Sequence, residues 1–537
     1  MTHRPAVPIA GSPMNGGSKT VQSEPWMLAA ILALATTAVF LPAVRCGFVN
    51  WDDGKYVYQN PTVLGGLTFD GCRHAFSDVI FSNWAPLTIL SYQLDATLFG
   101  IQPWGFHLTN VLLHAASTAI LFICLVRMTG ETGPSLAVAA CFGLHPLRVE
   151  SVVWIAERKD VLSVFFLMLS LLAYERYCRR SDASRHGLVV LGMLASLLCK
   201  STLVTLPVLL VLLDVWPLRR IQLPGMVLVG SEADSTPHYA PISWKTCFRE
   251  KVPLLALSVF FSLITMAAQG DAIQAEGAFP LLTSRLPNAL HAIVWYVWIT
   301  FWPVGLKPFY RHAASELSPL AVVACGASVV AAAIVVGKLA RRRPSLAVGM
   351  AWFGIALMPM LGIVAQPGFQ GRADRFTYVP HIGLLMALVW WAADVAKRKQ
   401  IPSAWQVAGC LAVVAALSTA SVRQIPIWQS PDTLWPAMIA RDPACSMAHM
   451  KYANHLVATR RLAAAEPHYR AAIEHATADW PGHVCRITSL SNLACLYHDL
   501  GDQQRAGVAR DLAVEIDPHD VAVEHMLEHL KVPTGHR

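Results

Sequence analysis

Two adjacent carboxylates, Asp52 and Asp53, directly follow the first apolar stretch of the chain. A carboxylate that lies against a low-dielectric membrane interface can have a raised pKa and accept a proton from an alcohol as a general base. Two such oxygen ligands can equally bind a divalent cation. The alternative is an ordinary turn or helix start at Asp52-Asp53-Gly54, which the doublet alone favours.

Ionisable side chains also gather where a later apolar stretch ends. They are His145, Arg148, Glu150, Glu157, Arg158 and Asp160. Interfacial snorkelling, in which a long basic side chain reaches from the membrane to water, suits Lys159 but accounts poorly for Glu150 and Asp160. Ionisable residues at membrane depth are costly and usually mark a functional site.

Two further groups of cations could neutralise a phosphate. Lys200 stands between two apolar stretches, and a buried lysine needs a carboxylate or a ligand phosphate as its anion. Arg372 and Arg375 flank Asp374 at the start of a late apolar stretch. Two guanidiniums suit a phosphate or pyrophosphate leaving group, and the alternative is that they anchor the end of a membrane span.

Two stripes at helical spacing accompany these residues. The polar stripe consists of His107, Asn110, His114 and Thr118. It predicts a helix face turned to the interior of a bundle, where the alternative role is hydrogen bonding between helices. The apolar stripe consists of Leu87, Leu90, Leu94 and Leu98. It predicts a helix that lies flat on the outer leaflet and roofs a lipid-headgroup pocket beside the acidic pair.

Membrane helices must position these residues. Of 537 residues, 55% are hydrophobic and only 14% are charged, with a mean hydropathy of +0.45. A soluble domain carries about 25% charged residues, so this composition excludes a cytosolic enzyme and a disordered chain. The net charge of +8 comes from short basic clusters between apolar stretches, which is not the pattern of a nucleic-acid partner. The 12 cysteines form no CxxC pair, so no zinc site is expected.

We expect a flexible tail over residues 1–25 and an all-helical membrane domain over residues 26–422. The first apolar stretch, Trp26 to Arg45, is predicted to be an uncleaved anchor. Further apolar stretches begin near Phe106, Ser135, Val161, Gly187, Thr202, Pro253, Ala289, Leu320, Leu346, Phe376 and Ser403. Basic clusters lie at residues 176–185, 338–343 and 397–399, and their charge predicts a cytoplasmic location for all of them.

An odd number of apolar stretches separates the first two basic clusters. If every stretch crossed the membrane, the two clusters would lie on opposite sides. We therefore predict that the short stretch from Ala289 to Trp302 is a re-entrant or partial helix, which leaves about eleven crossings. The outer face then carries an outer loop at residues 46–105, residues 157–160 and 366–375, and everything after Ser421.

After Ser421 the charge rises and the apolar residues become periodic. A tetratricopeptide register fits Trp435, Pro443, Tyr452, Ala453, Ala465, Tyr469, Ala472, Leu493, Ala494, Tyr497, Gly501, Ala506, Ala513 and Pro518. Ala453 and Ala494 are 41 residues apart, which predicts an insertion around residues 479–483. We expect a repeat domain over residues 431–537, and the alternative is an unrelated stack of helical hairpins.

Short motifs recur across most of the predicted membrane domain. They occupy residues 83–91, 98–100, 106–114, 144–151, 156–163, 203–207, 214–217 and 373–380. Together with the repeats that follow them, these segments resemble the transmembrane and tetratricopeptide-repeat family of membrane glycosyltransferases, including its bacterial relatives. Jointly the motifs are specific, whereas each alone is weak.

The resemblance implies a GT-C type fold that transfers a sugar, mannose or a similar hexose, from a polyprenyl- or dolichyl-phosphate carrier to a hydroxyl of a protein Ser or Thr. By match with the acidic pair of protein O-mannosyltransferases, Asp52 is the general base, and Asp53 binds the acceptor or a metal or orients Asp52. Direct attack would invert the anomeric carbon. The predicted substrate and lipid-phosphate ligands are His145, Arg148, Glu150, Glu157, Arg158, Asp160, Lys200, Arg372, Asp374 and Arg375.

One departure from the family pattern is Ala85, which stands where the family often has a basic residue. If that residue helps to bind phosphate, this chain must use another cation. The expected location is the bacterial cytoplasmic membrane, with the repeats on the periplasmic side, where they present a protein acceptor or dock a partner. Apart from a possible divalent cation, no cofactor is expected.

Two other functions stay open. Buried His, Lys and Asp residues also mark ion paths, so a transporter or flippase would carry them too. A non-catalytic membrane anchor would use its repeats to assemble other proteins. The transporter predicts no sugar transfer in detergent, and the anchor predicts that loss of the repeats abolishes function while a change at Asp52 does nothing.

Overall fold

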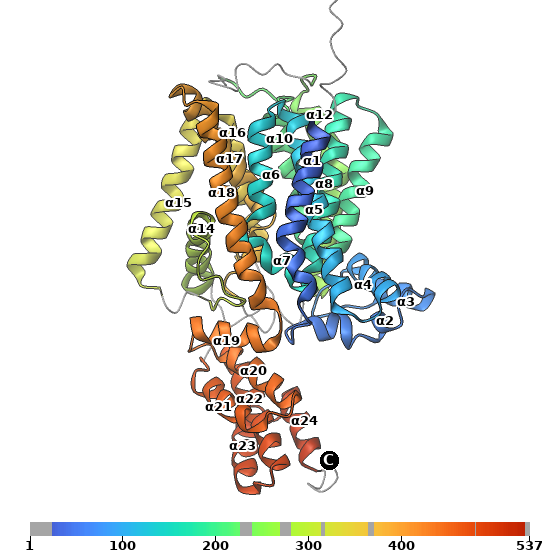
Figure 1. The fold of residues 1–537 in the computed structure, drawn as a ribbon, viewed down its shortest axis with the longest axis vertical. Helices are drawn as coiled ribbons and strands as arrows, with labels where there is room; N and C mark the ends of the chain where they lie inside the picture. Colours follow the sequence, from blue (N-terminus) through green and yellow to red (C-terminus); the bar gives the residue numbers. More distant parts are fainter. Residues whose placement is uncertain are drawn as a thin grey trace, which may run out of the picture.

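The computed structural model describes residues 24–225, 239–268, 281–312, 317–363, 370–477 and 480–531. Over these residues the chain is a bundle of long helices with a smaller group of helices below it (Figure 1). This all-helical architecture confirms the fold class that the composition predicts. The expected tail falls outside the described residues except for Glu24 and Pro25, which already belong to the first helix.

Each apolar stretch forms a helix, and proline at the first helical position, where no backbone N–H is needed, starts several of them. The bundle consists of α1 (Glu24–Phe40), α5 (Pro103–Thr129), α6 (Thr132–Leu144), α7 (Val149–Val153), α8 (Arg158–Arg179), α9 (Ala183–Cys199), α10 (Leu206–Val215), α12 (Trp244–Ala268), α14 (Leu286–Phe301), α15 (Pro319–Leu339), α16 (Pro344–Leu357), α17 (Pro380–Arg398) and α18 (Ser403–Gln424).

Among the described residues, 6 helices are long and apolar enough to cross a membrane. The bent pair Thr132–Leu144 and Pro146–Val153 raises this to as many as 7. The stretches at Ala183–Cys199, Ser201–Val215 and Pro344–Met360 are apolar but shorter. The chain is therefore a multi-spanning helical membrane protein, while the count of eleven crossings and the re-entrant role of α14, which is 16 residues long, stay predictions.

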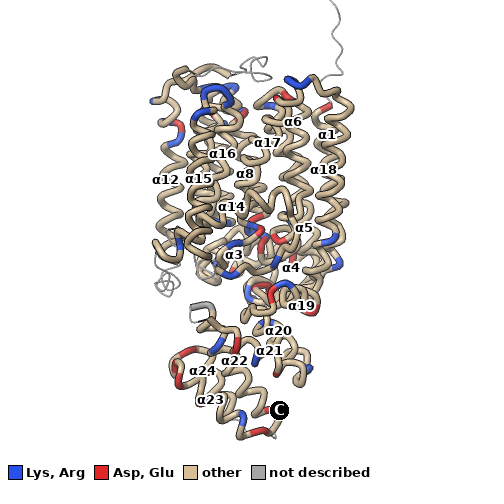
Figure 2. The backbone as a smooth tube through the Cα atoms, turned by 90° about the vertical axis from the view of Figure 1, so that its left-hand side faces the viewer, with Lys and Arg blue, Asp and Glu red and all other residues tan. Residues whose placement is uncertain are grey.

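The two ends of the bundle differ in charge. Helices α8, α15 and α17 end at one face, whereas α18 leads into the C-terminal helices at the opposite face (Figure 1). Figure 2 shows Lys and Arg gathered at the first face, and both signs of charge mixed inside the bundle near the second. The candidate site and the C-terminal helices thus share one face, away from the basic clusters. Which face is cytoplasmic stays a prediction.

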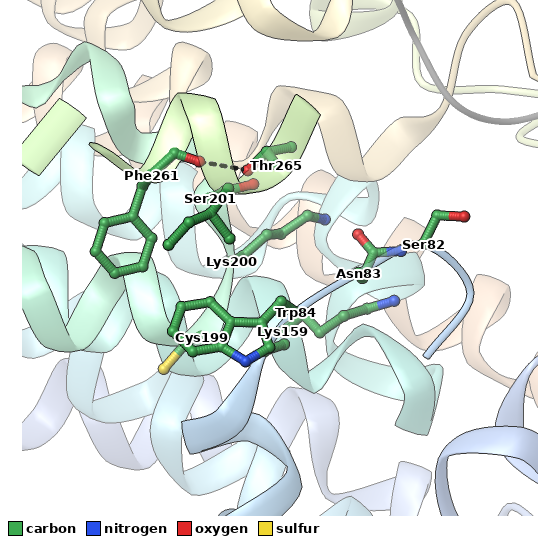
Figure 3. Close-up of a pocket in the computed structure, with 11 residues that line it drawn as sticks. Ser82, Asn83, Trp84, Lys159, Cys199, Lys200, Ser201, Phe261 and Thr265 are labelled. Carbon is green, nitrogen blue, oxygen red and sulfur yellow. Dashed lines mark hydrogen bonds between the residues drawn. The ribbon is translucent and has the colours of Figure 1, made fainter. Parts of the chain in front are cut away.

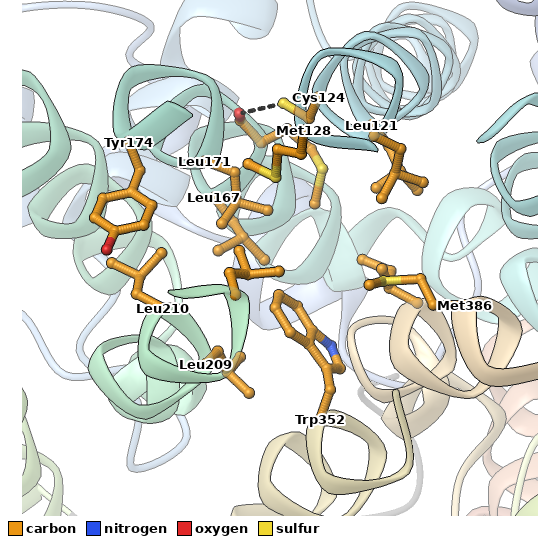
Figure 4. Packing of buried hydrophobic residues seen from close by; sticks show 14 of the residues in the cluster. Leu121, Cys124, Met128, Leu167, Leu171, Tyr174, Leu209, Leu210, Trp352 and Met386 are labelled. Atoms are coloured by element: carbon orange, nitrogen blue, oxygen red, sulfur yellow. Dashed lines mark hydrogen bonds between the residues drawn. The ribbon is translucent and has the colours of Figure 1, made fainter. Parts of the chain in front are cut away.

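The bundle core is formed by apolar side chains from α1, α5, α6, α8, α9, α10, α12, α16 and α17. Figure 4 shows Leu121 and Met128 of α5 near Leu167 of α8, with Trp352 of α16 below them. Where α16 crosses α17, a Cβ added to Gly349 would lie 2.5 Å from the carbonyl oxygen of Gly383. Only small residues permit so close a crossing in a membrane.

The outer loop folds into short helices beside the bundle, namely α2 (Pro61–Leu64), α3 (Phe69–Ser77) and α4 (Pro86–Phe99). Asn60 and Thr68 begin α2 and α3 by accepting hydrogen bonds from backbone N–H groups of the first turn. On α4, Leu94 and Leu98 are 45% and 63% exposed. Leu87 and Leu90 of the same stripe are only partly exposed, so a helix that lies flat on the outer leaflet stays a prediction.

The C-terminal region is a run of helices in which α20 packs on α21 and α22 packs on α23. Its helices are α19 (Pro431–Arg441), α20 (Ser446–Ala458), α21 (Leu462–Glu474), α22 (Trp480–Asp499), α23 (Gln503–Ile516) and α24 (Val521–Leu530). Ala453, Ala465, Tyr469 and Ala506, all on the tetratricopeptide register, are buried together. The repeat assignment itself stays a prediction, and Asp479 of the expected insertion lies outside the described residues.

Candidate active site

Asp53 is held inside the protein by two backbone N–H groups. The amide of Val49 donates to its Oδ2 atom at 2.8 Å, and the amide of Ala156 donates to its Oδ1 atom at 3.0 Å. Burial raises the pKa of Asp53 to about 7, against the lowering effect of these two hydrogen bonds. Asp53 therefore ties the outer loop to the segment that begins α8.

Asp52 differs from its neighbour because its side chain is only partly buried. Burial raises the pKa of the Asp52 carboxyl, and the charges of Lys159, Lys451 and Arg375 act in the opposite direction. The Asp52 carbonyl accepts the backbone N–H of Tyr56 at 3.1 Å, which starts a helical turn over Gly54–Tyr58. Asp52 is thus the more accessible carboxylate of the pair.

Lys200 lies between two of the predicted carboxylates. Its Nζ atom is 2.7 Å from Asp160 and 3.2 Å from Glu157. Glu157 and Asp160 share one side because they lie on consecutive turns where η5 (Ile155–Glu157) passes into α8. Lys200 reaches them from the break between α9 and η6 (Ser201–Thr205). A buried lysine needs an anion, and here two carboxylates supply it.

Arg375 joins the same cluster from the chain segment before α17. Its guanidinium pairs with Glu150 and lies 3.4 Å from Glu157, and its backbone N–H donates to Glu150 at 2.9 Å. The neighbouring Asp374 accepts a hydrogen bond from the Tyr310 hydroxyl at 2.8 Å. Burial raises the pKa of the Asp374 carboxyl well above its usual range. The predicted segments 145–160, 200 and 374–375 therefore meet in space.

Three predicted ligands make their contacts away from the carboxylate cluster. Arg158 is fully buried, where it pairs with Asp95 at 2.5 Å and donates to the carbonyl of Phe106 at 2.6 Å. Arg148 is equally buried and donates to the Thr377 hydroxyl at 2.7 Å. His145 lies 3.0 Å from the Thr300 carbonyl. These side chains support the elements around the site rather than face its pocket.

Arg372 also stands apart from the carboxylate cluster. Its guanidinium lies 2.5 Å from a ring nitrogen of His291 and 5.2 Å from the ring centre of Trp295, both on α14. In the polar stripe of α5, His114 contacts the Tyr378 hydroxyl at 2.6 Å and the Gly143 carbonyl at 2.9 Å. His114 therefore makes hydrogen bonds from α5 to α6 and to the segment before α17, which is the alternative role predicted for this stripe.

A small, partly open pocket lies next to Lys200. Its polar lining comes from Ser82, Asn83, Lys159, Lys200, Ser201 and Thr265, and its apolar lining includes Trp84, Phe261 and Ile264. Figure 3 shows the two lysine side chains extending toward Asn83 and Ser82, with Phe261 on the other side. Ala85, the departure from the family pattern, also lines this pocket.

Lys159 connects the pocket to the acidic pair, although it was not among the predicted ligands. Its side chain is 8% exposed, its Nζ atom lies 3.7 Å from Glu157, and its ammonium lies 4.2 Å from the ring centre of Tyr56. The snorkelling interpretation is wrong for this residue because α8 turns its first charged residues inward. Its position one residue before Asp160 and beside two carboxylates was the signal that could have found it.

A metal ion has no evident set of ligands in the described part of the chain, where no group of three or more His, Cys, Asp or Glu side chains could hold one. Both oxygens of Asp53 already accept backbone hydrogen bonds. The site consists of one partly exposed carboxylate, a network of alternating charges and a lysine-lined pocket.

Part of the chain is similar to curated proteins. The Tmtc1 protein O-mannosyl-transferase of Drosophila melanogaster is 32% identical over 195 residues, which are 35% of this chain and 22% of that protein. Human TMTC1, also a protein O-mannosyl-transferase, is 22% identical over 528 residues, which are 88% of this chain and 57% of that protein. The chain is a distant homologue of the TMTC proteins. It spans about a fifth to somewhat over half the length of these relatives.

Comparisons with protein-family models and with solved structures add little. No protein-family model matches this chain. The crystal structure of ArnT from Cupriavidus metallidurans, bound to undecaprenyl phosphate, shares 16% identity and a TM-score of 0.33 over 88% of this chain and 80% of ArnT. A TM-score this low indicates only a distant likeness of the two chains.

Proposed function

We propose that the protein is a membrane glycosyltransferase that moves a sugar, mannose or a similar hexose, from a polyprenyl- or dolichyl-phosphate carrier to a hydroxyl group, with protein Ser or Thr as the favoured acceptor. One observation carries the proposal: Lys159 lines the lysine pocket and also lies against Glu157 and Tyr56 beside the acidic pair. A phosphate in the pocket and a base outside it would then be neighbours. The TMTC relatives are protein O-mannosyl-transferases, which supports the acceptor class.

The polar lining and the apolar lining of the pocket both suit a lipid-linked phosphate. Lys159 and Lys200 supply two ammonium groups, and Asn83, Ser82 and Ser201 can donate hydrogen bonds to phosphate oxygens. Phe261 and Ile264 belong to α12, which is a candidate membrane span with an exposed outer surface. A prenyl chain can lie along this helix while its phosphate stays with the lysines. Lys159 and Lys200 would also take the place of the basic residue that the family often has where this chain has Ala85.

The proposed reaction is a direct displacement. The acceptor oxygen forms a bond to the anomeric carbon while the bond from that carbon to the carrier phosphate oxygen breaks. The proton of the acceptor hydroxyl passes to Asp52, and the electron pair of the broken bond leaves with the phosphate. Lys159 and Lys200 would balance the charge that develops on the phosphate. Attack opposite the leaving group inverts the anomeric configuration.

The other predicted residues would serve this arrangement indirectly. Glu157, Asp160 and Glu150 would hold the lysines and Arg375 in place, and Asp53 would orient the loop that carries Asp52. The C-terminal helices would present a protein acceptor on the same face, which is the periplasmic face in the predicted topology. Asp374 and Arg372 would fix the segment before α17.

The test is sugar transfer by purified protein. The protein is incubated in detergent with radiolabelled polyprenyl-phosphate sugars and a membrane extract, and labelled product is separated from donor. We expect label in a protein fraction from at least one of these donors. A transporter or flippase would leave every donor intact, and a non-catalytic anchor would do the same, so intact donor in all reactions contradicts the proposal.

A further inference from the structure

Hydrogen bonds of Asn50 join the loop of the acidic pair to the C-terminal helices. The side-chain amide of Asn50 uses both of its ends there. Its Oδ1 atom accepts a hydrogen bond from Trp435 Nε1 of α19 at 2.6 Å, and its Nδ2 atom donates to the carbonyl of Lys451 in α20 at 3.0 Å. A third bond runs from the Gly47 amide to the Gln429 carbonyl at 2.8 Å. Both ends of the loop segment are thus fixed from outside the membrane domain.

Aromatic packing continues the same contact. The Trp51 ring lies 5.3 Å from Trp435 of α19 and 5.1 Å from Trp154, and Trp154 in turn stacks on Trp428 at 5.7 Å. Trp435 is fully buried in one continuous core with Tyr56 of the outer loop. Domains that only touch have smaller and more polar interfaces. The first helices of the C-terminal region and the outer loop therefore share one apolar core.

An ionic contact holds α19 to a third element. Asp442, at the end of α19, lies 3.4 Å from Lys307 and 3.3 Å from Arg311. Both cations belong to the segment that follows α14. The hairpin α19–α20 thus contacts the outer loop and the segment after α14.

Lys451 brings a charge to this contact. It is the residue of α20 whose carbonyl binds Asn50, and its ammonium acts on Asp52 in the direction that lowers the pKa of that carboxyl. The other charged groups that act on Asp52 are Lys159, Arg375, Glu157 and Asp53. All of those belong to the membrane domain or the outer loop. Lys451 is the group that the C-terminal region adds.

We propose that the hairpin α19–α20 forms one wall of the active site, in which Trp435 and Lys451 act as positioning residues for Asp52. The inference rests on the proposed glycosyltransferase function. It assigns the C-terminal region a part in the chemical step, beyond the presentation of a protein acceptor. Transfer to a short peptide should therefore depend on Trp435 and Lys451 as strongly as transfer to a whole protein does.

The experiment uses point variants of the full chain. Trp435→Phe keeps an aromatic ring but removes the N–H that Asn50 accepts, and Lys451→Met removes the charge while keeping a long apolar stem. Lys451→Arg is the rescue variant. Trp405→Phe, at a position 72% exposed on α18, and Lys531→Met, at the exposed end of α24, are the matched controls. The readouts are kcat and donor KM with a short peptide acceptor, and hydrogen exchange of the amides at residues 47–53.

Because small displacements of a catalytic group are costly, Trp435→Phe should lower kcat by about 10- to 100-fold. Lys451→Met keeps the carbonyl that Asn50 contacts, and it should lower kcat because it removes a charge that lowers the pKa of Asp52, so that less of this base is ionised. Donor KM should stay unchanged, since neither residue lines the lysine pocket. Exchange at residues 47–53 should be faster in Trp435→Phe, and Lys451→Arg should recover most of the turnover. Normal kcat in both Trp435→Phe and Lys451→Met overturns the inference. If the wild type transfers no sugar, the proposed function fails instead, and unchanged exchange at residues 47–53 then overturns the positioning role by itself.

Discussion

The carboxylate of Asp53 accepts a hydrogen bond from the backbone amide of Ala156, 3.0 Å away and 103 residues later in the chain. This bond joins the outer loop to the start of α8, which carries Lys159 and Asp160. A second backbone donor, Val49, occupies the other oxygen of Asp53. Asp53 is therefore a clamp between the outer loop and the start of α8, and in the proposed reaction Asp52 is the carboxylate that meets the substrate.

The clamp predicts that Asp53→Asn harms folding more than chemistry. An asparagine can accept only one of the two backbone N–H groups through its oxygen and turns an N–H₂ group toward the other. Leaving a buried donor unpaired costs about 1–3 kcal/mol. We expect a lower thermal unfolding midpoint, with turnover per folded molecule reduced less than in Asp52→Asn. A variant as stable as the wild type would show that the clamp is unimportant.

Protonation of Asp53 should make stability depend on pH. Its pKa is raised to about 7 in the folded protein, whereas an unfolded aspartate titrates near pH 4. The folded protein therefore holds the proton more tightly, and this stabilisation is fully present below about pH 4 and is lost as the pH rises through about 7. The unfolding midpoint of the wild type should fall between about pH 4 and 7, and Asp53 should change it little above that range. The same fall in Asp53→Asn would assign it to another group.

Removing the Lys200 charge should weaken donor binding. Lys200→Met leaves Glu157 and Asp160 without their shared cation and removes one of the two pocket ammonium groups. A hydrogen bond to a charged group contributes about 1.5–3 kcal/mol, so donor KM should rise by about 10- to 100-fold. Lys200→Arg should recover part of this loss, and Lys55→Met, at an exposed position of the outer loop, should behave as the wild type. An unchanged donor KM in Lys200→Met would move the phosphate elsewhere.

The topology can be checked by labelling single cysteines in intact cells. Reporters at residues 55, 70 and 511 should react without permeabilisation, whereas reporters at 180, 342 and 398 should not, because the last three lie in the basic clusters. The structure already groups the C-terminal helices with the acidic pair on one face. Labelling of residue 511 only after permeabilisation would reverse the predicted orientation.

The sequence allowed the helices to be predicted more fully than the site. Apolar stretches such as the one that forms α18 can be predicted to be helices from their length and composition alone. Between Pro146 and Glu157, however, three short helical turns follow one another with bends between them. No single period describes such a segment, so the sequence could not show that Arg158 turns into the core while Lys159 turns into the site. Lys451 was missed for another reason, because nearly 400 residues separate it from Asp52.

Chelation should leave turnover intact. Both oxygens of Asp53 are held by backbone N–H groups, so the acidic pair offers a cation only the side chain of Asp52. A divalent ion bound by protein usually takes several oxygen ligands. Incubation with a chelator followed by the transfer assay measures this. Activity that disappears on chelation and returns with an added divalent cation would contradict the assignment of Asp53 as a clamp.

The general-base role of Asp52 is the central claim, and turnover of Asp52→Asn tests it most directly. The substitution keeps size and hydrogen bonding but removes the base, and general-base catalysis is typically worth about 10²- to 10⁴-fold in rate. Transfer per monodisperse molecule should fall at least about 100-fold, with the lipid donor still bound. Asp70→Asn, at an exposed position of the same loop, should match the wild type. Near-normal turnover of Asp52→Asn would remove Asp52 from the active site and contradict the account.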